Sequence, residues 1–149
     1  MKVSDIKSSG LNKRVLQTLA GYFKAEFDTG DPVLDELDIC DLAGGDWLMK
    51  QGDPGDALYF LVRGRLQAWA RNENGNDRGR FLNEIVPGDS VGELSLLTGA
   101  PRAVGIQAIR DSLLIRLDRE AFERLAQDHP ALVMRLAANV ATLLQSSSF

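Results

Sequence analysis

Short runs of strand-forming residues alternate with glycine-rich breaks between Leu37 and Asp118, and this pattern constrains the fold more than any other feature. The runs are LDICDL, DWLMKQ, ALYFLV, RLQAWAR, RFLNEIV, AVGIQAI and SLLIRL, and the breaks include AGG at 43–45, GDPGD at 52–56, Gly64 and PGD at 87–89. Seven or eight short strands, roughly 8 to 12 residues apart, are typical of an antiparallel sandwich or barrel. The sequence therefore predicts a mainly β fold, an antiparallel β jelly roll (double-stranded β-helix).

Helical periodicity flanks the predicted strands. Residues 11–27 space their apolar side chains as an amphipathic helix does, and Pro32 can begin a short helical piece. After the last strand, Asp118 has the chemistry of an N-cap, and Pro130 ends one helix and can begin the next. The prediction is a jelly roll with an N-terminal helix and two C-terminal helices.

The chain has 149 residues, 44% of them hydrophobic, which is the size and composition of a single globular domain. Within that single domain, 1–149, we predict an N-terminal helical segment at 1–36, the jelly roll at 37–118 and the C-terminal helices at 119–145. The stretch NENGNDRG at 72–79 is predicted as a solvated hairpin tip, because Asn74-Gly75 accepts the positive φ angles of a primed turn.

Composition excludes several classes of function. A formal charge of −4 and no run of Lys or Arg argue against nucleic acid binding by this chain alone. One cysteine, Cys40, and one histidine, His129, cannot make a disulfide framework, a zinc cluster or a cupin-like metal site. No apolar run reaches the length of a transmembrane segment, and no signal core begins the chain. We expect a cytoplasmic protein without metal or cofactor.

The stretch VGELSLLTGAPR at 91–102 interrupts the strand pattern. It holds one glutamate, Glu93, and one arginine, Arg102, apart across an apolar helical turn and a TGAP turn. Two readings are open from the residues alone: the two charges form an ion pair that closes a loop, or they bind a ligand. An exposed ion pair contributes only about 0–1 kcal/mol, so stability alone is a weak reason for this arrangement.

Here the sequence resembles the cyclic nucleotide-binding domain family. The Gly-Glu pair, the short apolar helix and the Pro-Arg-Ala ending match that family's phosphate-binding cassette at 92–103, and framework glycines have counterparts in Gly52, Gly64 and Gly88. The resemblance covers roughly 37–145. The sequence departs from the family at VGI after PRA, where Gly105 is expected to loosen a strand beside the cassette.

The resemblance implies a 3′,5′-cyclic nucleotide as ligand. Its phosphate needs a cation with forked donors, and its ribose hydroxyl needs a fixed acceptor; Arg102 and Glu93 have these properties. The family's pattern assigns the phosphate to Arg102, the 2′-hydroxyl to Glu93, and further ligand contacts to Gly92, Leu94, Ser95 and Ala103. Alanine rather than Thr or Ser after the arginine favours cyclic AMP over cyclic GMP.

Domains of this family act on an attached effector. The cassette together with RDSLLIRLDREAFERL is most similar to the domains that precede patatin-like phospholipases of the neuropathy target esterase type, so we expect a regulatory domain of such a serine esterase. No nucleophile with a base partner is visible, and we expect no catalysis by this chain. The alternatives are a non-binding interaction module and the sensor half of a catabolite-activator-type transcription regulator.

The last helix carries an apolar stripe formed by Leu132, Leu136, Val140 and Leu143 or Leu144. This stripe can cover the open side of the barrel, or it can form a parallel homodimer as in the catabolite-activator branch of the family. The sequence leaves both open.

Overall fold

The computed structural model describes residues 1–71 and 79–147, with the side chains of 146 and 147 left out. The predicted hairpin tip with Asn74-Gly75 lies outside the described residues. In chain order the elements are the 3₁₀ turn η1 (Val3–Asp5), α1 (Ser9–Phe23), the 3₁₀ turn η2 (Pro32–Glu36), β1 (Asp38–Leu42), β2 (Trp47–Met49), β3 (Ala57–Ala70), β4 (Arg80–Ile85), β5 (Ser90–Val91), α2 (Glu93–Thr98), β6 (Gly105–Asp118), α3 (Arg119–Asp128) and α4 (Pro130–Ser147).

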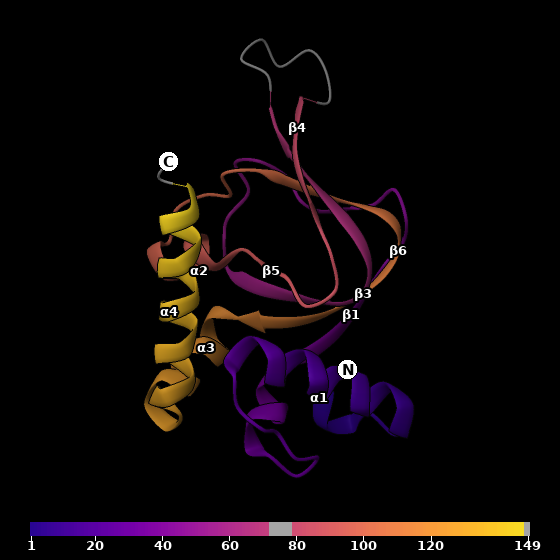
Figure 1. The fold of residues 1–149 in the computed structure, drawn as a ribbon, viewed down its shortest axis with the longest axis vertical. Coiled ribbons are helices and arrows are strands. Elements are labelled where there is room, and N and C mark those ends of the chain that lie inside the picture. The colour runs from indigo at the N-terminus through magenta and orange to yellow at the C-terminus, as the bar shows by residue number, and fades with distance from the viewer. Residues whose placement is uncertain (72–78, 148–149) are drawn as a thin grey trace.

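All described strands pair antiparallel in one sheet that curls into a barrel (Figure 1). Its order is β1-β6-β3-β4, with β2 added to β6 and β5 added to β3. Helix α1 lies below the barrel in the view of Figure 1, and α4 runs along its side next to α2. The predicted mainly β jelly roll with flanking helices is confirmed.

Two pairs of runs that were predicted as separate strands form continuous strands. ALYFLV and RLQAWAR join across Gly64 as the 14-residue strand β3, and AVGIQAI and SLLIRL join as the 14-residue strand β6. Gly64 has φ +107°, and the β3–β6 register shifts around it, so this glycine makes an irregularity within the strand. The prediction of separate strands at these places was therefore wrong.

The sheet has an apolar core on each face. The barrel core, inside the curled sheet, consists of Met49, Leu61, Leu66, Ala68, Ile85, Ile106, Ala108 and Leu114. The second core, here called the helix-side core, lies between the sheet and the helices and includes Leu19 and Phe23 of α1, Phe60 of β3, Leu96 of α2 and Leu136 of α4. Alternate residues of β3 and β6 supply both cores, because successive strand side chains point to opposite faces.

Local chemistry sets the helix ends. Ser8 caps α1 by accepting the backbone N–H of Leu11 at 3.3 Å, and Lys24 ends the helix in the left-handed conformation at φ +53°. The helix therefore stops four residues before the end of the predicted 11–27 segment, whose last residue is Phe27. Asp118 caps α3 as predicted, accepting the N–H of Ala121 at 2.8 Å.

The apolar stripe of α4 is divided. Leu136 and Val140 are buried against the domain, whereas Leu143 and Leu144 near the end of the helix are 54% and 49% exposed. The first half of the stripe thus covers the domain, one of the two roles that the sequence left open. Within the described ranges, 1–71 and 79–147, no helix combines the length and apolarity needed to cross a membrane.

Gly105 begins β6 in a close contact with a tryptophan. A Cβ at this position would lie 2.8 Å from Cζ3 of Trp47, on the neighbouring strand β2. The indole ring occupies the space that a side chain at 105 would fill. The glycine that was expected to loosen the strand therefore permits close packing of β2 on β6.

Gly64→Ala is expected to reduce the free energy of unfolding by about 2–4 kcal/mol, because it combines a strained backbone with overpacking. The new Cβ would lie 2.6 Å from the Cα of Ser112, and φ is +107°. The matched control is Gly21→Ala on α1, where a Cβ meets nothing within 4 Å and a gain of about 0.4–1 kcal/mol is expected. Urea denaturation of both variants measures the difference, and an unchanged midpoint for Gly64→Ala would contradict the assignment.

Candidate functional site

The cassette at 92–103 leaves the sheet after β5 and returns at β6. Gly92 begins it with φ +96° as the N-cap of α2, and Gly99 ends α2 with φ +76°, donating its N–H to the carbonyl of Ser95 at 2.8 Å. Left-handed conformations at both ends are accessible to glycine at little cost. The short apolar helix predicted in this stretch is therefore fixed between two glycine turns.

Arg102 is buried, and backbone oxygens hold its guanidinium. Only 5% of the residue is exposed. Its Nη2 donates to the carbonyl of Ala57 at 2.7 Å, and its Nη1 donates to the carbonyl of Gly92 at 3.3 Å. A Cβ at Gly92 would lie 2.6 Å from Nη1, so the absence of a side chain there makes room for the guanidinium.

Burial lowers the pKa of Arg102, and the neighbouring positive charge of Arg116 acts in the same direction. Asp56 and Asp53 raise the pKa but do not offset burial. None of the ion pairs among the described residues includes Arg102. In the part of the chain that the structure describes, this buried cation therefore has no paired carboxylate, an arrangement that costs stability and is common at functional sites.

Glu93 is also buried, at 7% exposure, but its partner is a serine hydroxyl. Ser90 of β5 donates from Oγ to Oε1 of Glu93. The described residues give no hydrogen bond to Oε2, so one carboxylate oxygen is held and the other can accept a bond from a ligand.

The two charges of the cassette have different neighbours. Ser90 pairs with Phe60, a helix-side core residue, so the serine that holds Glu93 lies on the helix side of the β3–β5 pair. Tyr59, which packs against the barrel core, is among the groups that act on the Arg102 charge. Of the two readings that the sequence left open, the ion pair between Glu93 and Arg102 is not formed in this structure.

The other predicted ligand residues differ in exposure. Leu94 is 49% exposed on α2, and Ala103 is exposed beside Arg102. Ser95 is buried, and its Oγ lies 3.5 Å from the carbonyl of Pro101. A Cβ at Gly55 would overlap the side chain of Ser95, so the loop before β3 packs directly on α2.

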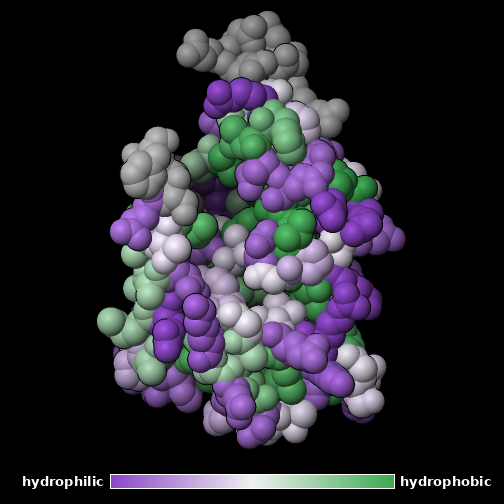
Figure 2. Space-filling view, in the orientation of Figure 1, coloured by the Kyte–Doolittle hydropathy of each residue, from purple (hydrophilic) through white to green (hydrophobic). Residues whose placement is uncertain are grey.

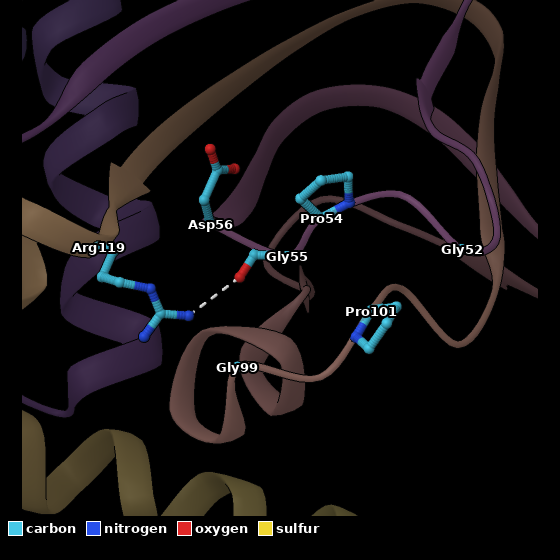
Figure 3. Close-up of a pocket in the computed structure, with 7 residues that line it drawn as sticks. All are labelled: Gly52, Pro54, Gly55, Asp56, Gly99, Pro101 and Arg119. Atoms are coloured by element: carbon cyan, nitrogen blue, oxygen red, sulfur yellow. Dashed lines mark hydrogen bonds between the residues drawn. The ribbon is translucent and has the colours of Figure 1, made fainter.

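A hollow of about 440 Å³ borders the cassette (Figure 3). It is lined by Gly52, Pro54, Gly55, Asp56, Gly99, Pro101 and Arg119. Arg119 reaches across from the start of α3, where its Nη2 donates to the carbonyls of Gly55 and Ser95, each at 3.1 Å. None of the six predicted ligand residues lines this hollow.

The sequence analysis missed a second cation near Arg102. Arg116 of β6 lies two residues after Leu114 and shares its barrel-core face, and its Nε donates to the hydroxyl of Tyr59 at 3.4 Å. The polar residue in SLLIRL at a barrel-facing position could have indicated it. Within the described ranges there is no group of His, Cys, Asp and Glu side chains that could hold a metal ion.

Comparison with known proteins shows which family of domains this chain matches. The family model described as "Cyclic nucleotide-binding domain" matches residues 39–129. A cyclic nucleotide-binding domain from Methylobacillus flagellatus KT has a TM-score of 0.75 at 20% identity, over 90% of this chain and 76% of that chain. The regulatory domain of Toxoplasma gondii PKA, solved with cAMP, has a TM-score of 0.69 at 25% identity, over 83% of this chain and 47% of that chain.

A curated relative is an enzyme of much greater length. The lysophospholipase NTE1 of Coccidioides immitis (strain RS) is 35% identical over 105 residues. The match covers 70% of this chain and only 6% of the relative. The similarity is therefore confined to one small part of that enzyme.

Arg102→Met is expected to leave the free energy of unfolding unchanged or to raise it by up to about 1 kcal/mol. The reason is that removing a buried charge without a carboxylate partner relieves its desolvation cost, which offsets the loss of the two hydrogen bonds to the carbonyls of Ala57 and Gly92. Arg110→Met, at an exposed position on β6, is the matched control and should change stability by no more than about 0.5 kcal/mol. Thermal and urea unfolding measure both; a loss above about 2 kcal/mol in Arg102→Met alone would make the guanidinium a structural group.

Proposed function

The chain belongs to the cyclic nucleotide-binding domain family, and on that premise we propose that it is a regulatory domain that binds a 3′,5′-cyclic nucleotide, with cyclic AMP preferred over cyclic GMP. The observation that carries the proposal is the buried guanidinium of Arg102, which lacks a carboxylate partner among the described residues. A cation kept at this cost inside a cassette matches the need of a buried anionic ligand.

Arg102 would bind the cyclic phosphate. Arginine carries five N–H donors, and the contacts of Arg102 use one N–H on each of two nitrogens, so others remain for phosphate oxygens. A planar guanidinium can contact two phosphate oxygens at once, which a lysine ammonium cannot do. The exocyclic phosphate charge would also provide the opposite charge that Arg102 lacks.

Glu93 would bind the ribose. Its Oε1 is held by Ser90, and its Oε2 can accept the 2′-hydroxyl of the nucleotide. Because Glu93 lies at the start of the cassette and Arg102 near its end, a nucleotide that contacts both would bridge the two ends. Such a ligand shifts the cassette only by the difference in its affinity for the two conformations.

The preference for cyclic AMP is supported by Ala103. This exposed residue follows Arg102 directly and carries no hydroxyl for the guanine edge of cyclic GMP. The structure of the PKA regulatory domain with cAMP offers a parallel for the ligand in a similar fold. The Gly92, Leu94 and Ser95 contacts complete the proposed ligand set.

The proposed output is control of an attached effector, a patatin-like serine esterase. The support is the similarity to lysophospholipase NTE1, of which this chain matches 6%. The chain itself is assigned ligand binding and no catalysis, because its fold is that of a cyclic nucleotide-binding domain. A homodimer through α4 stays a prediction.

Calorimetric titration of the domain with cyclic AMP and cyclic GMP tests the proposal. We expect saturable binding, tighter for cyclic AMP, and a loss of about 100-fold or more in Arg102→Met, because removing one partner of a buried charge pair costs about 2–5 kcal/mol. Glu93→Gln should lose about tenfold, and Ala103→Thr should reduce the preference for cyclic AMP.

Arg110→Met is the control, since it removes a guanidinium at an exposed position outside the cassette. Absence of heat with either nucleotide, from a protein that melts cooperatively, would contradict ligand binding. The alternative of a non-binding interaction module would then stand.

The effector proposal has its own test. In a polypeptide that joins this chain to a patatin-type esterase domain, added cyclic AMP should change the rate of lysophospholipid hydrolysis. A rate that is the same at saturating cyclic AMP and without nucleotide would contradict control by this domain.

A further inference from the structure

Tyr22 of α1 carries a buried hydroxyl that the binding site described above does not use. Its Oη is shielded from solvent and has no hydrogen-bond partner within normal geometry among the described residues. Buried hydroxyl groups in proteins are nearly always hydrogen-bonded, so this exception requires an explanation.

The position of Tyr22 is fixed by ring packing against the sheet. Its ring lies edge-on to Phe60 at a centroid distance of 4.7 Å and to Phe23 at 5.0 Å. Phe60 is the ladder partner of Ser90, so the two side chains share a face of the β3–β5 pair. The packing therefore places the tyrosine next to the serine that holds Glu93.

Charge and polarity around the hydroxyl agree with this placement. Burial raises the pKa of the Tyr22 phenol, and the charge of Glu93 raises it further. The side chains of Ser90 and Asn139 act in the opposite direction. Tyr22 thus lies within electrostatic range of the carboxylate assigned to the ribose.

The same tyrosine is joined to the last helix. Asn139 of α4 donates from Nδ2 to the backbone carbonyl of Tyr22 at 2.9 Å. One residue of α1 therefore contacts α4 through its backbone and approaches Ser90 and Glu93 through its side chain. Helix α1, at 9–23, lies outside the 39–129 segment that the family model matches.

We propose that Tyr22 is a positioning residue for Glu93: its buried hydroxyl lies against the Ser90–Glu93 hydrogen bond, and by donating to Ser90 Oγ it orients the carboxylate that receives the ribose 2′-hydroxyl. The ribose role of Glu93 is part of the proposed function, and the inference rests on it. No residue of α1 was assigned to the site by the sequence analysis.

The chemistry of the three groups allows such a chain. A serine hydroxyl donates one hydrogen bond and can accept others, so Ser90 can donate to Glu93 and accept from Tyr22 at the same time. Each bond in such a chain polarises the next, which strengthens the hold on Oε1. A small movement of Tyr22 from its unpartnered position would complete the chain, with or without a bound nucleotide.

The proposal is tested by measuring the affinity of Tyr22→Phe for cyclic AMP and for 2′-deoxy cyclic AMP. The variant keeps the ring on Phe60 and removes only the hydroxyl. We expect affinity for cyclic AMP to fall about fivefold and affinity for 2′-deoxy cyclic AMP to be unchanged, because the deoxy compound lacks the group that Glu93 receives. In a Ser90→Ala background, Tyr22→Phe should change neither affinity by more than about 1.5-fold.

Thr18→Ala is the matched control. It removes a hydroxyl from the same helix, but this hydroxyl is exposed and donates to the Arg14 carbonyl of its own helix at 2.9 Å. If Tyr22 has only a structural role, Tyr22→Phe will lower the melting temperature and reduce the affinity for both nucleotides equally. Equal loss for both nucleotides, or no loss for either when the wild type binds cyclic AMP, overturns the proposal and leaves the proposed function standing.

A measurement without ligand separates this proposal from the proposed function. Unfolding of Tyr22→Phe, Glu93→Gln and the double variant forms a double-mutant cycle. Coupling of at least threefold in the unfolding equilibrium constant is expected, and strictly additive effects overturn the proposal. If the wild type binds neither nucleotide, the proposed function fails, and this cycle alone decides whether Tyr22 positions Glu93.

Discussion

The antiparallel pairing of β3 with β6 underlies both cores and both halves of the candidate site. The ladder runs from Ala57 opposite Asp118 to Trp69 opposite Gly105. At its first end, the carbonyl of Ala57 receives Arg102, and three residues later Phe60 supports both Ser90 and Tyr22. Long-range pairing of this kind aligns groups that are distant in sequence. The cassette depends on this alignment, because its two charges have no direct contact with each other.

Different groups form hydrogen bonds with the two buried charges of the cassette. Arg102 is satisfied by backbone carbonyls, which cannot neutralise it, whereas Glu93 is satisfied by a neutral hydroxyl. Neither charge is therefore cancelled within the described protein, and each retains hydrogen-bonding capacity. An ion pair between them would have made a poor binding site, since a ligand would have to break it.

Composition and pattern predicted the fold class, the cap at Asp118 and the charges of the cassette. Strand continuity across Gly64 was not predictable, since a glycine with positive φ can end a strand or lie within one, and the choice depended on packing against Ser112. The hydrogen-bond partners of the two charges could not be predicted from the sequence either. Strand register and backbone geometry bring Ala57 to Arg102 and Ser90 to Glu93. In the sequence, Tyr22 occupies an apolar position of the amphipathic helix, so nothing there indicated that its hydroxyl lies near the site.

Figure 2 shows hydrophobic colour below the uppermost grey segment. Phe81 and Leu82 of β4 are 46% and 39% exposed although they lie in a strand, and their exposure follows from the position of β4 at one end of the strand order.

Arg119 connects the loop before β3, helix α2 and the start of α3. Its Nη2 contacts the carbonyl of Gly55 in the loop before β3 and that of Ser95 in α2, while its own backbone begins α3. Gly55 packs on Ser95 without an intervening side chain. A displacement of α2 must therefore carry the loop and the first turn of α3 with it, or break the hydrogen bond between Arg119 and Ser95. Arg119, at the junction of β6 and α3, thus couples any movement of the cassette to the start of the C-terminal helices.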